Sequence, residues 1–184
     1  AIAELQENLN LPRLPRRIEC YDISNIQGTT PVGSMIVFKD GRPEKGDYRR
    51  FQIKSTDGPD DYQMMREMLE RRLVRLGNGG GQSEKDYTNT KFFDKSNAWR
   101  MVPDLILIDG GKGHLNVALQ VLLELGLTNI PVASLAKENE EIFVTGTSEP
   151  AILDRESAAL FLVQRARDEA HRFAISTHRN KRIK

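Results

Sequence analysis

The apolar and polar positions along the chain follow a pattern that predicts a mixed α/β protein. Three strand-like runs rich in branched and aromatic side chains come first, at about residues 17–24, 32–39 and 47–54. The pair Asp40-Gly41 lies between the second and third runs, and Asp-Gly between apolar runs favours a reversal of the chain. We therefore expect these strands to form an antiparallel meander.

A helix and a long loop are predicted after the meander. Methionine and leucine side chains recur at helical spacing between residues 64 and 73, which predicts a helix over about 59–76. From Gly77 to Met101 the sequence becomes polar and rich in glycine, with no sustained periodicity. Such a stretch predicts a flexible surface loop.

The second half of the chain reads as buried strands alternating with helices. The run at 104–109 is continuously apolar, which is typical of a parallel strand buried on both faces. A final amphipathic helix is expected to begin near Arg155. The elements predicted between these two are a helix at 113–125 ended by Gly126, a strand at 131–136, and short extended pieces at 141–145 and 151–153.

This order of elements is the one that an RNase H-like fold would show. We predict an α/β fold with a mixed central sheet flanked by helices, in which the first and fourth strands lie side by side. A chain of 184 residues suits a single core. We expect that domain over 17–178, with the loop at 77–101 inside it, a lead or linker at 1–16, and a basic linker at 179–184.

Two carboxylates stand at the ends of apolar strands. Asp22 lies near the end of the first strand-like run, in Ile18 to Ser24, and Asp109 ends the run at 104–109, directly before Gly110-Gly111. A carboxylate beside buried apolar side chains is costly unless a cation or a proton compensates it. Functional groups also gather at the carboxyl ends of strands in open α/β sheets. The pair therefore predicts one shared site for Mg²⁺ or Mn²⁺, which prefer oxygen ligands.

His171 is the candidate for a third group in this site. It follows Ala170 at the edge of the apolar stripe of the last helix, so it is expected to reach a site rather than bulk water. An imidazole there would bind metal or act as a general acid or base. The alternative is a histidine at the boundary of a core helix, and the spacing by itself does not exclude it.

Several charged residues are secondary candidates. Lys112 lies in a glycine-rich turn before a helix, and Lys137 follows a predicted strand, so both are candidates for phosphate contacts, as is Arg172. The turn lacks the spacing of a Walker motif. Asp60 and Asp61 fall in the first turn of a predicted helix, where acidic side chains favour the helix dipole without any catalytic role.

Hydropathy, cysteine content and charge distribution indicate the environment in which the protein works. No apolar run approaches the roughly 20 residues needed to span a bilayer. The one cysteine, Cys20, lies in a predicted strand, where a buried apolar role in a reducing cytoplasm is expected. From Arg165 to Lys184 there are seven basic residues and two acidic ones, +7 − 2 = +5. Such a basic C-terminal segment favours the binding of phosphate groups. Because the chain begins without methionine, we expect a piece of a longer protein.

With these residues in view, the sequence resembles the C-terminal endonuclease domain of the UvrC family, the incision subunit of bacterial nucleotide excision repair. The resemblance covers most of the chain. It rests on four ordered segments, which are Arg17 to Ser24, Asp60-Asp61-Tyr62, Leu105 to Gly113, and Arg167 to Ala174.

The resemblance implies an RNase H-like fold and an Asp-Asp-His triad, carried onto Asp22, Asp109 and His171. It implies divalent-metal-dependent incision on the 5′ side of damaged double-stranded DNA, with UvrB as a protein partner. The family's GIY-YIG nuclease, its UvrB-binding segment and its tandem helix-hairpin-helix module are not among these residues. The stretch at 77–101 is longer than the family pattern leads us to expect.

Two functions of other classes stay open from the sequence. One is a catalytically silent RNase H-like module that binds nucleic acid or a protein, and the intact acidic residues argue against it. The other is a nucleotide-binding enzyme that uses the glycine-lysine turn, which would bind ATP without DNA.

Overall fold

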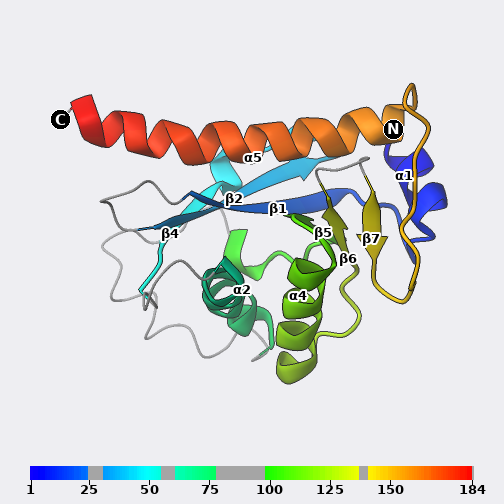
Figure 1. Ribbon diagram of the computed structural model, residues 1–184, viewed down its shortest axis with the longest axis horizontal. Coiled ribbons are helices and arrows are strands. Elements are labelled where there is room, and N and C mark those ends of the chain that lie inside the picture. The colour runs from blue at the N-terminus through cyan, green and yellow to red at the C-terminus, as the bar shows by residue number, and fades with distance from the viewer. Residues whose placement is uncertain (25–30, 55–60, 78–97, 137–140, 184) are drawn as a thin grey trace.

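A mixed sheet of seven strands forms the centre of the molecule (Figure 1). The computed structural model describes residues 1–24, 31–54, 61–77, 98–136 and 141–183, and in the last helix it describes side chains up to residue 176. The strands are β1 (Arg17–Ser24), β2 (Val32–Lys39), β3 (Arg42–Pro43), β4 (Arg49–Gln52), β5 (Leu105–Asp109), β6 (Val132–Leu135) and β7 (Ile142–Val144).

The sheet has the order β3-β2-β1-β5-β6-β7, and β4 also pairs with β2. The first part is antiparallel, because β2 runs against β1, β3 and β4. The central part is parallel, because β5 pairs with β1 on one side and with β6 on the other. The predicted meander and the predicted neighbourhood of the first and fourth strands are both confirmed, and so is the mixed α/β class.

Helices cover both faces of the sheet (Figure 1). The long helix α5 (Ala158–Ile183) lies across one face, and α2 (Asp61–Gly77) and α4 (Lys112–Leu125) lie on the other. The helix α1 (Ile2–Leu9) packs beside the start of α5, and two 3₁₀ turns are η1 (Lys45–Asp47) and η2 (Ala98–Arg100). Within the described residues, no helix combines the length and the apolar character needed to cross a bilayer.

Alternation along β1 divides the buried side chains between two cores. Ile18 and Cys20 belong to the core under α5, whereas Tyr21 belongs to the core under α2 and α4. Successive side chains of a strand point to opposite faces, so Asp22 follows Cys20 toward α5. The expectation that Cys20 is a buried apolar residue is confirmed, since its exposed fraction is 0%.

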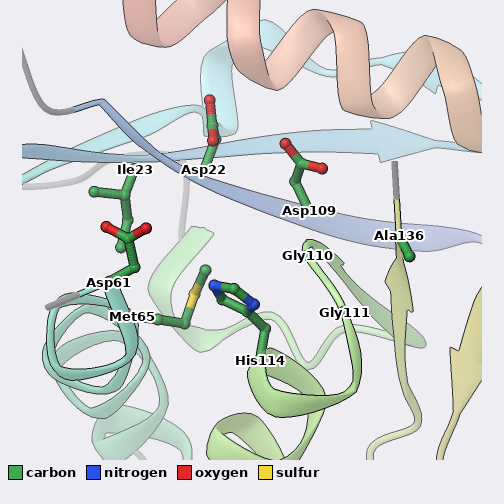
Figure 2. A pocket seen from close by; sticks show the side chains of 9 residues that line it. All are labelled: Asp22, Ile23, Asp61, Met65, Asp109, Gly110, Gly111, His114 and Ala136. Atoms are coloured by element: carbon green, nitrogen blue, oxygen red, sulfur yellow. The ribbon is translucent and has the colours of Figure 1, made fainter. Parts of the chain in front are cut away.

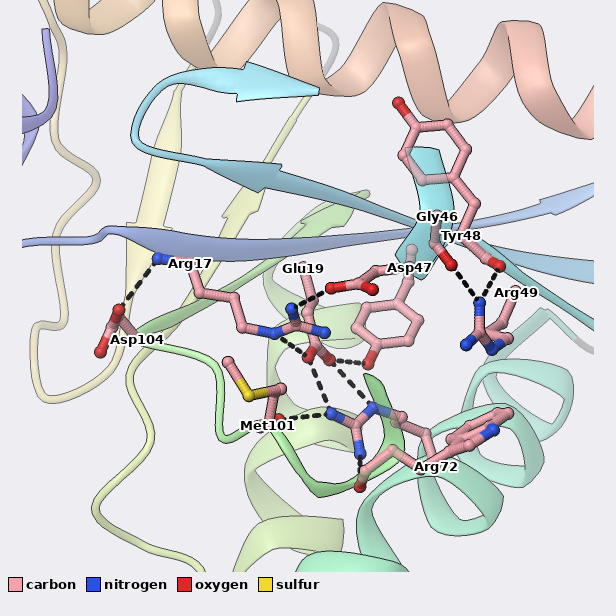
Figure 3. Close-up of polar contacts among 11 residues, drawn as sticks. Arg17, Glu19, Gly46, Asp47, Tyr48, Arg49, Arg72, Met101 and Asp104 are labelled. Atoms are coloured by element: carbon pink, nitrogen blue, oxygen red, sulfur yellow. Dashed lines mark hydrogen bonds and ion pairs between the residues drawn. The ribbon is translucent and has the colours of Figure 1, made fainter. Parts of the chain in front are cut away.

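A buried ionic network crosses the core on the α2 side of β1 (Figure 3). Arg72 Nη2 lies 2.8 Å from Glu19 Oε2, and both side chains are fully buried. Tyr21 donates from its hydroxyl to Glu19, and Arg17 donates from Nε at 3.1 Å. Arg72 also donates to the carbonyl oxygen of Met101 at 2.7 Å. The network therefore ties β1 and α2 to the chain that leads into β5.

The structure corrects the predicted ends of the chain. Residues 2–9, predicted as part of a lead or linker, form α1, and Leu5 and Leu9 are buried one helical turn apart. Asn10 ends this helix in the left-handed conformation, which a short polar side chain tolerates. Residues 179–183, predicted as a linker, continue α5. The helix α1 was missed because a helix of two turns gains its stability from packing, here against α5.

Other boundaries shift by a few residues. The third run forms a strand only over β4, because η1 occupies its beginning. The last helix begins at Ala158 rather than near Arg155, and the piece at 151–153 makes a single bridge through Ala151. Most of the loop predicted at 77–101 lies outside the described residues, although Gly77 ends α2 and η2 covers 98–100.

Candidate active site

A pocket of about 460 Å³ opens at the carboxyl ends of β1 and β5, where α2 and α4 begin. We call it the acidic pocket. It is lined by Asp22, Ile23, Asp61, Met65, Asp109, Gly110, Gly111, His114 and Ala136. Figure 2 shows the Asp22 and Asp109 side chains next to each other beneath α5, with Asp61 and His114 approaching from α2 and α4.

Strand register brings the two predicted carboxylates together. In the parallel pair of β1 and β5, Tyr21 lies opposite Ile108. The next residues, Asp22 and Asp109, therefore lie side by side near the carboxyl ends of these strands, Asp109 as the last residue of β5 and Asp22 two residues before the end of β1. Neighbouring strands are about 4.8 Å apart. Two residues 87 positions apart in the sequence therefore meet because their strands are parallel and adjacent.

Electrostatics in the acidic pocket favour a bound cation. Burial, and next the charge of Asp109, raise the pKa of Asp22, while His171 opposes the shift. The Oδ1 atom of Asp109 is buried and has no hydrogen-bond partner among the described residues. Burial and the same two carboxylates raise the pKa of the nearby Cys20 thiol. The burial and mutual repulsion of the two carboxylates are a cost that a positive charge between them would reduce.

His171 lies at the open side of the pair. Its Nδ1 atom is 3.5 Å from Asp22 Oδ2, and 67% of its side chain is exposed, against 14% for Asp22. Helix α5 brings it there by crossing the sheet above β1 (Figure 1). The side chain therefore lies beside Asp22, and its ring is much more exposed than expected for a residue at the edge of a core.

The acidic pocket also contains residues that sequence reasoning did not select. His114, from the first turn of α4, lines the pocket and packs edge-to-face against Tyr62 with the ring centroids 4.8 Å apart. A Cβ atom at Gly110 would collide with the His114 ring, and one at Gly113 would collide with the Tyr62 hydroxyl. Gly110 and Gly113 therefore allow the close packing of His114 and Tyr62, and the cluster of glycines after Asp109 was the signal in the sequence for it.

Only some of the secondary candidate residues lie at the acidic pocket. Asp61 lines the acidic pocket. Lys112 is exposed at the first position of α4, beside the lining residue Gly111. Arg172 binds Glu169 through two hydrogen bonds and lines a different pocket, next to Phe38, so the structure does not bring it to the carboxylates. Asp60 and Lys137 lie outside the described residues.

Comparison with known families assigns the family and the fold of this chain. The family model described as the UvrC RNase H endonuclease domain matches residues 6–175. The chain belongs to this UvrC domain family. The two adjacent carboxylates therefore lie inside the matched region of an endonuclease domain, and the fold is RNase H-like.

Similar proteins cover the whole chain. It is 50% identical over 184 residues to the UvrABC system protein C of Moorella thermoacetica, a match that covers 100% of this chain and 27% of that protein. It is 46% identical over 183 residues to the UvrABC system protein C of Desulforudis audaxviator, covering 99% and 29%. The chain thus spans less than a third of the length of these UvrC relatives.

Solved structures include distant matches. A crystal structure of Ciona intestinalis endonuclease V in complex with a 24mer DNA that contains an inosine followed by a ribo-adenosine matches with a TM-score of 0.42 and 15% identity. That match covers 74% of this chain and 55% of the other. A D234N form of the same enzyme with a 23mer DNA matches with a TM-score of 0.41.

The acidic pocket holds few preformed metal ligands. Across the part of the chain that the structure describes, no three His, Cys, Asp or Glu side chains are grouped closely enough to hold a metal ion by themselves. Mg²⁺ is commonly bound by one or two carboxylates together with waters and substrate phosphates. Asp22 and Asp109 fit that mode of binding, with the orphaned Asp109 oxygen as the most direct sign.

Proposed function

We propose that this UvrC-family domain is a metal-dependent endonuclease that hydrolyses a phosphodiester bond on the 5′ side of damaged DNA during nucleotide excision repair. One observation carries the proposal: Asp22 and Asp109 lie side by side near the carboxyl ends of adjacent parallel strands and share a pocket, and an oxygen of Asp109 is buried without a hydrogen-bond partner in the described part of the chain. Nuclease chemistry is the activity that the family description names.

In this proposal Asp22 and Asp109 bind the cation, Mg²⁺ or Mn²⁺. Both carboxylates must be ionised for this, and burial together with their mutual repulsion makes the ionised pair costly in the absence of a cation. When bound, a divalent ion supplies electrostatic stabilisation of the charge that builds up on the reacting phosphate. A cation between the two carboxylates would remove the repulsion that raises the pKa of Asp22, and this gain would contribute to the affinity for the metal and its phosphate ligand.

His171 completes the proposed Asp-Asp-His site. Its Nδ1 atom is near Asp22, and its exposed ring has direct access to solvent. An imidazole in such a position suits general acid or base catalysis. We assign it to proton transfer at the open side of the pocket or to a further metal contact. Asp61, which lines the same pocket, is a secondary acidic group.

Substrate and partners follow from the same assignment. Damaged double-stranded DNA is the proposed substrate, with Lys112 and Lys137 as contacts to its phosphates and UvrB as the protein partner within the UvrABC system. Arg172 is a weaker substrate candidate, because its guanidinium is engaged by Glu169. Lesion recognition and UvrB binding are assigned to other parts of the longer UvrC proteins, of which this chain spans less than a third.

The proposal is tested by DNA cleavage with supercoiled and bubble substrates in Mn²⁺, Mg²⁺ or EDTA. Asp22→Asn and Asp109→Asn keep the side-chain shape and remove the charge, and each is expected to lower the cleavage rate by at least about 100-fold. His171→Ala is expected to lower it by about 100-fold or more. A lesion at a defined position shows whether the cut falls on its 5′ side.

Asp168→Asn is the matched control, because Asp168 is an acidic residue on the same helix as His171 and its side chain is 74% exposed. It is expected to cut like the parent. Calorimetric titration with Mn²⁺ in the absence of DNA gives a second readout, in which the two site variants lose binding and the control keeps it. A folded variant lacking both carboxylates that still cuts like the parent would overturn the mechanism, and DNA binding without any cutting would favour the silent module.

A further inference from the structure

A row of three side chains crosses the sheet at the level of the acidic pocket. In the antiparallel register, Asp22 lies opposite Ser34, and Ser34 lies opposite Arg50 on β4. Directly paired residues of antiparallel strands project to the same face of a sheet. Asp22, Ser34 and Arg50 therefore share the face that α5 covers, with Arg50 on the side of Asp22 that is remote from Asp109.

Helix α5 contacts both ends of this row. His171 lies beside Asp22, and Phe173 and Ser176 lie beside Arg50. The helix rises about 7.5 Å between residues 171 and 176, which is compatible with the roughly 10 Å that separates β1 from β4 across two strand spacings. One helix thus positions a histidine and an arginine above the same line of strands.

The guanidinium of Arg50 is held in place by its surroundings. Its Cζ atom lies 4.0 Å from the centroid of the Phe173 ring, and Nη2 lies 3.5 Å from Ser176 Oγ. Phe173 packs edge-to-face against Tyr48 at 5.0 Å, and the Tyr48 hydroxyl donates to Glu169 at 2.7 Å. Stacking on an aromatic face orients a planar guanidinium.

Charge also favours an anion at this place. Partial burial lowers the pKa of Arg50, the direction expected for a cation partly withdrawn from water. A guanidinium carries five N–H donors in a fork that matches two phosphate oxygens. The substrate of a nuclease is a chain of phosphates, each of which presents two such oxygens.

We propose that Arg50 forms a second phosphate-binding site, which holds the DNA backbone close to the phosphate that is cut. The assignment rests on the proposed endonuclease function and extends it. The roughly 10 Å between β4 and β1 corresponds to about three nucleotides of rise along one strand of a duplex. Arg50 therefore contacts a phosphate within about three nucleotides of the scissile bond and fixes the register of the strand across Asp22 and Asp109.

The experiment removes the charge from one phosphate at a time. Each duplex substrate carries a single neutral methylphosphonate near the cut. Its cleavage is measured with the complete UvrC protein that contains this chain, under the conditions of the repair reaction. Arg50→Gln is expected to lower kcat/KM about 10- to 100-fold on the unmodified substrate, the value of a lost charge-assisted contact. The parent is expected to lose a similar factor at one methylphosphonate position, and Arg50→Gln is expected to lose nothing further there.

Arg49→Gln is the matched control. Arg49 is the neighbouring arginine on β4, but it pairs in register with Met35 and its Cζ atom lies 5.7 Å from the Trp99 ring, on the opposite face of the sheet. It should keep the sensitivity of the parent to the methylphosphonate at that one position. Arg50→Lys keeps the charge without the fork, so it should recover only part of the lost kcat/KM.

Duplex binding without cutting separates this site from the proposed chemistry. Binding is measured in EDTA over a range of salt concentrations, and Arg50→Gln should lower the slope of log affinity against log salt by about one phosphate contact. The phosphate site at Arg50 is refuted if Arg50→Gln keeps the salt dependence of binding seen in the parent and also loses further kcat/KM at every methylphosphonate position. Loss of cutting by the parent with an intact Arg50-dependent slope would instead overturn only the endonuclease function.

Discussion

Replacing Arg72 by methionine would remove the cation from an ion pair that is wholly buried. Arg72 and Glu19 both have exposed fractions of 0%. Arg72 donates two hydrogen bonds to the Glu19 carboxylate, at 2.8 and 3.2 Å. It donates two more to the carbonyl oxygens of Trp99 and Met101, at 2.9 and 2.7 Å. Methionine keeps much of the volume of the side chain but makes none of these bonds.

The magnitude follows from the charge that stays behind. Removing one partner of a buried ion pair costs about 3–5 kcal/mol of unfolding free energy. Arg17 Nε still lies 3.1 Å from Glu19 after the change, although Arg17 is also paired with Asp47 at 2.7 Å. The residual cation places the expected loss near the lower end of the range, at about 3 kcal/mol. In a chain of this size that corresponds to a fall in Tm of about 6–12 °C.

Urea unfolding of the parent and of Arg72→Met measures this loss. Arg66→Met is the control, because Arg66 lies on the same helix and pairs at the surface with Glu70, whose side chain is 45% exposed. Such pairs contribute about 0–1 kcal/mol. Adding Glu19→Gln to Arg72→Met should recover part of the stability, since the remaining buried charge is removed. Equal losses for Arg72→Met and Arg66→Met, at equal m values, would refute the reasoning.

Three further predictions concern the acidic pocket. Burial and Asp109 raise the folded-state pKa of Asp22, so the folded state holds more protons than the unfolded state, and stability falls as pH rises from the ordinary carboxyl pKa through the raised one. Asp22→Asn should remove this pH dependence and raise the unfolding free energy above that pH window by about 0.5–2 kcal/mol, while DNA cutting is lost. Urea unfolding of the parent and the variant between about pH 3 and 8 measures the difference. A variant that is less stable than the parent above the window would contradict the prediction. Gly110→Ala places a Cβ in the His114 ring at a backbone φ of +154°, which should cost about 1–3 kcal/mol; His114→Ala in the same background should recover part of that cost, and full stability of Gly110→Ala alone would contradict the packing. Cys20 is fully buried and burial raises the pKa of its thiol, so a thiol reagent should react only after denaturant is added; rapid labelling of the folded protein would count against the fold around Asp22.

The apolar periodicity of the sequence predicted those helices and strands whose pattern is visible within their own residues. The first two strands were placed at the residues where β1 and β2 lie, and the continuous run before Asp109 gave β5 as a buried parallel strand. The helix α4 and its glycine stop were also predicted, and Gly126 adopts the left-handed conformation there. The helix α1 was missed, because it has only two turns and gains its stability from packing against α5.

By itself, the sequence determined that this is an α/β domain of the UvrC family and that Asp22 and Asp109 lie near the carboxyl ends of two apolar strands. Apolar periodicity and strand-end charges are local properties, so they can be read from the order of residues. Only the tertiary structure decided which side chains meet: His171 at Asp22, His114 and Asp61 in the same pocket, and Arg50 under Phe173. Those contacts depend on strand register and on the path of α5 over the sheet, which are set by packing between residues far apart in the chain.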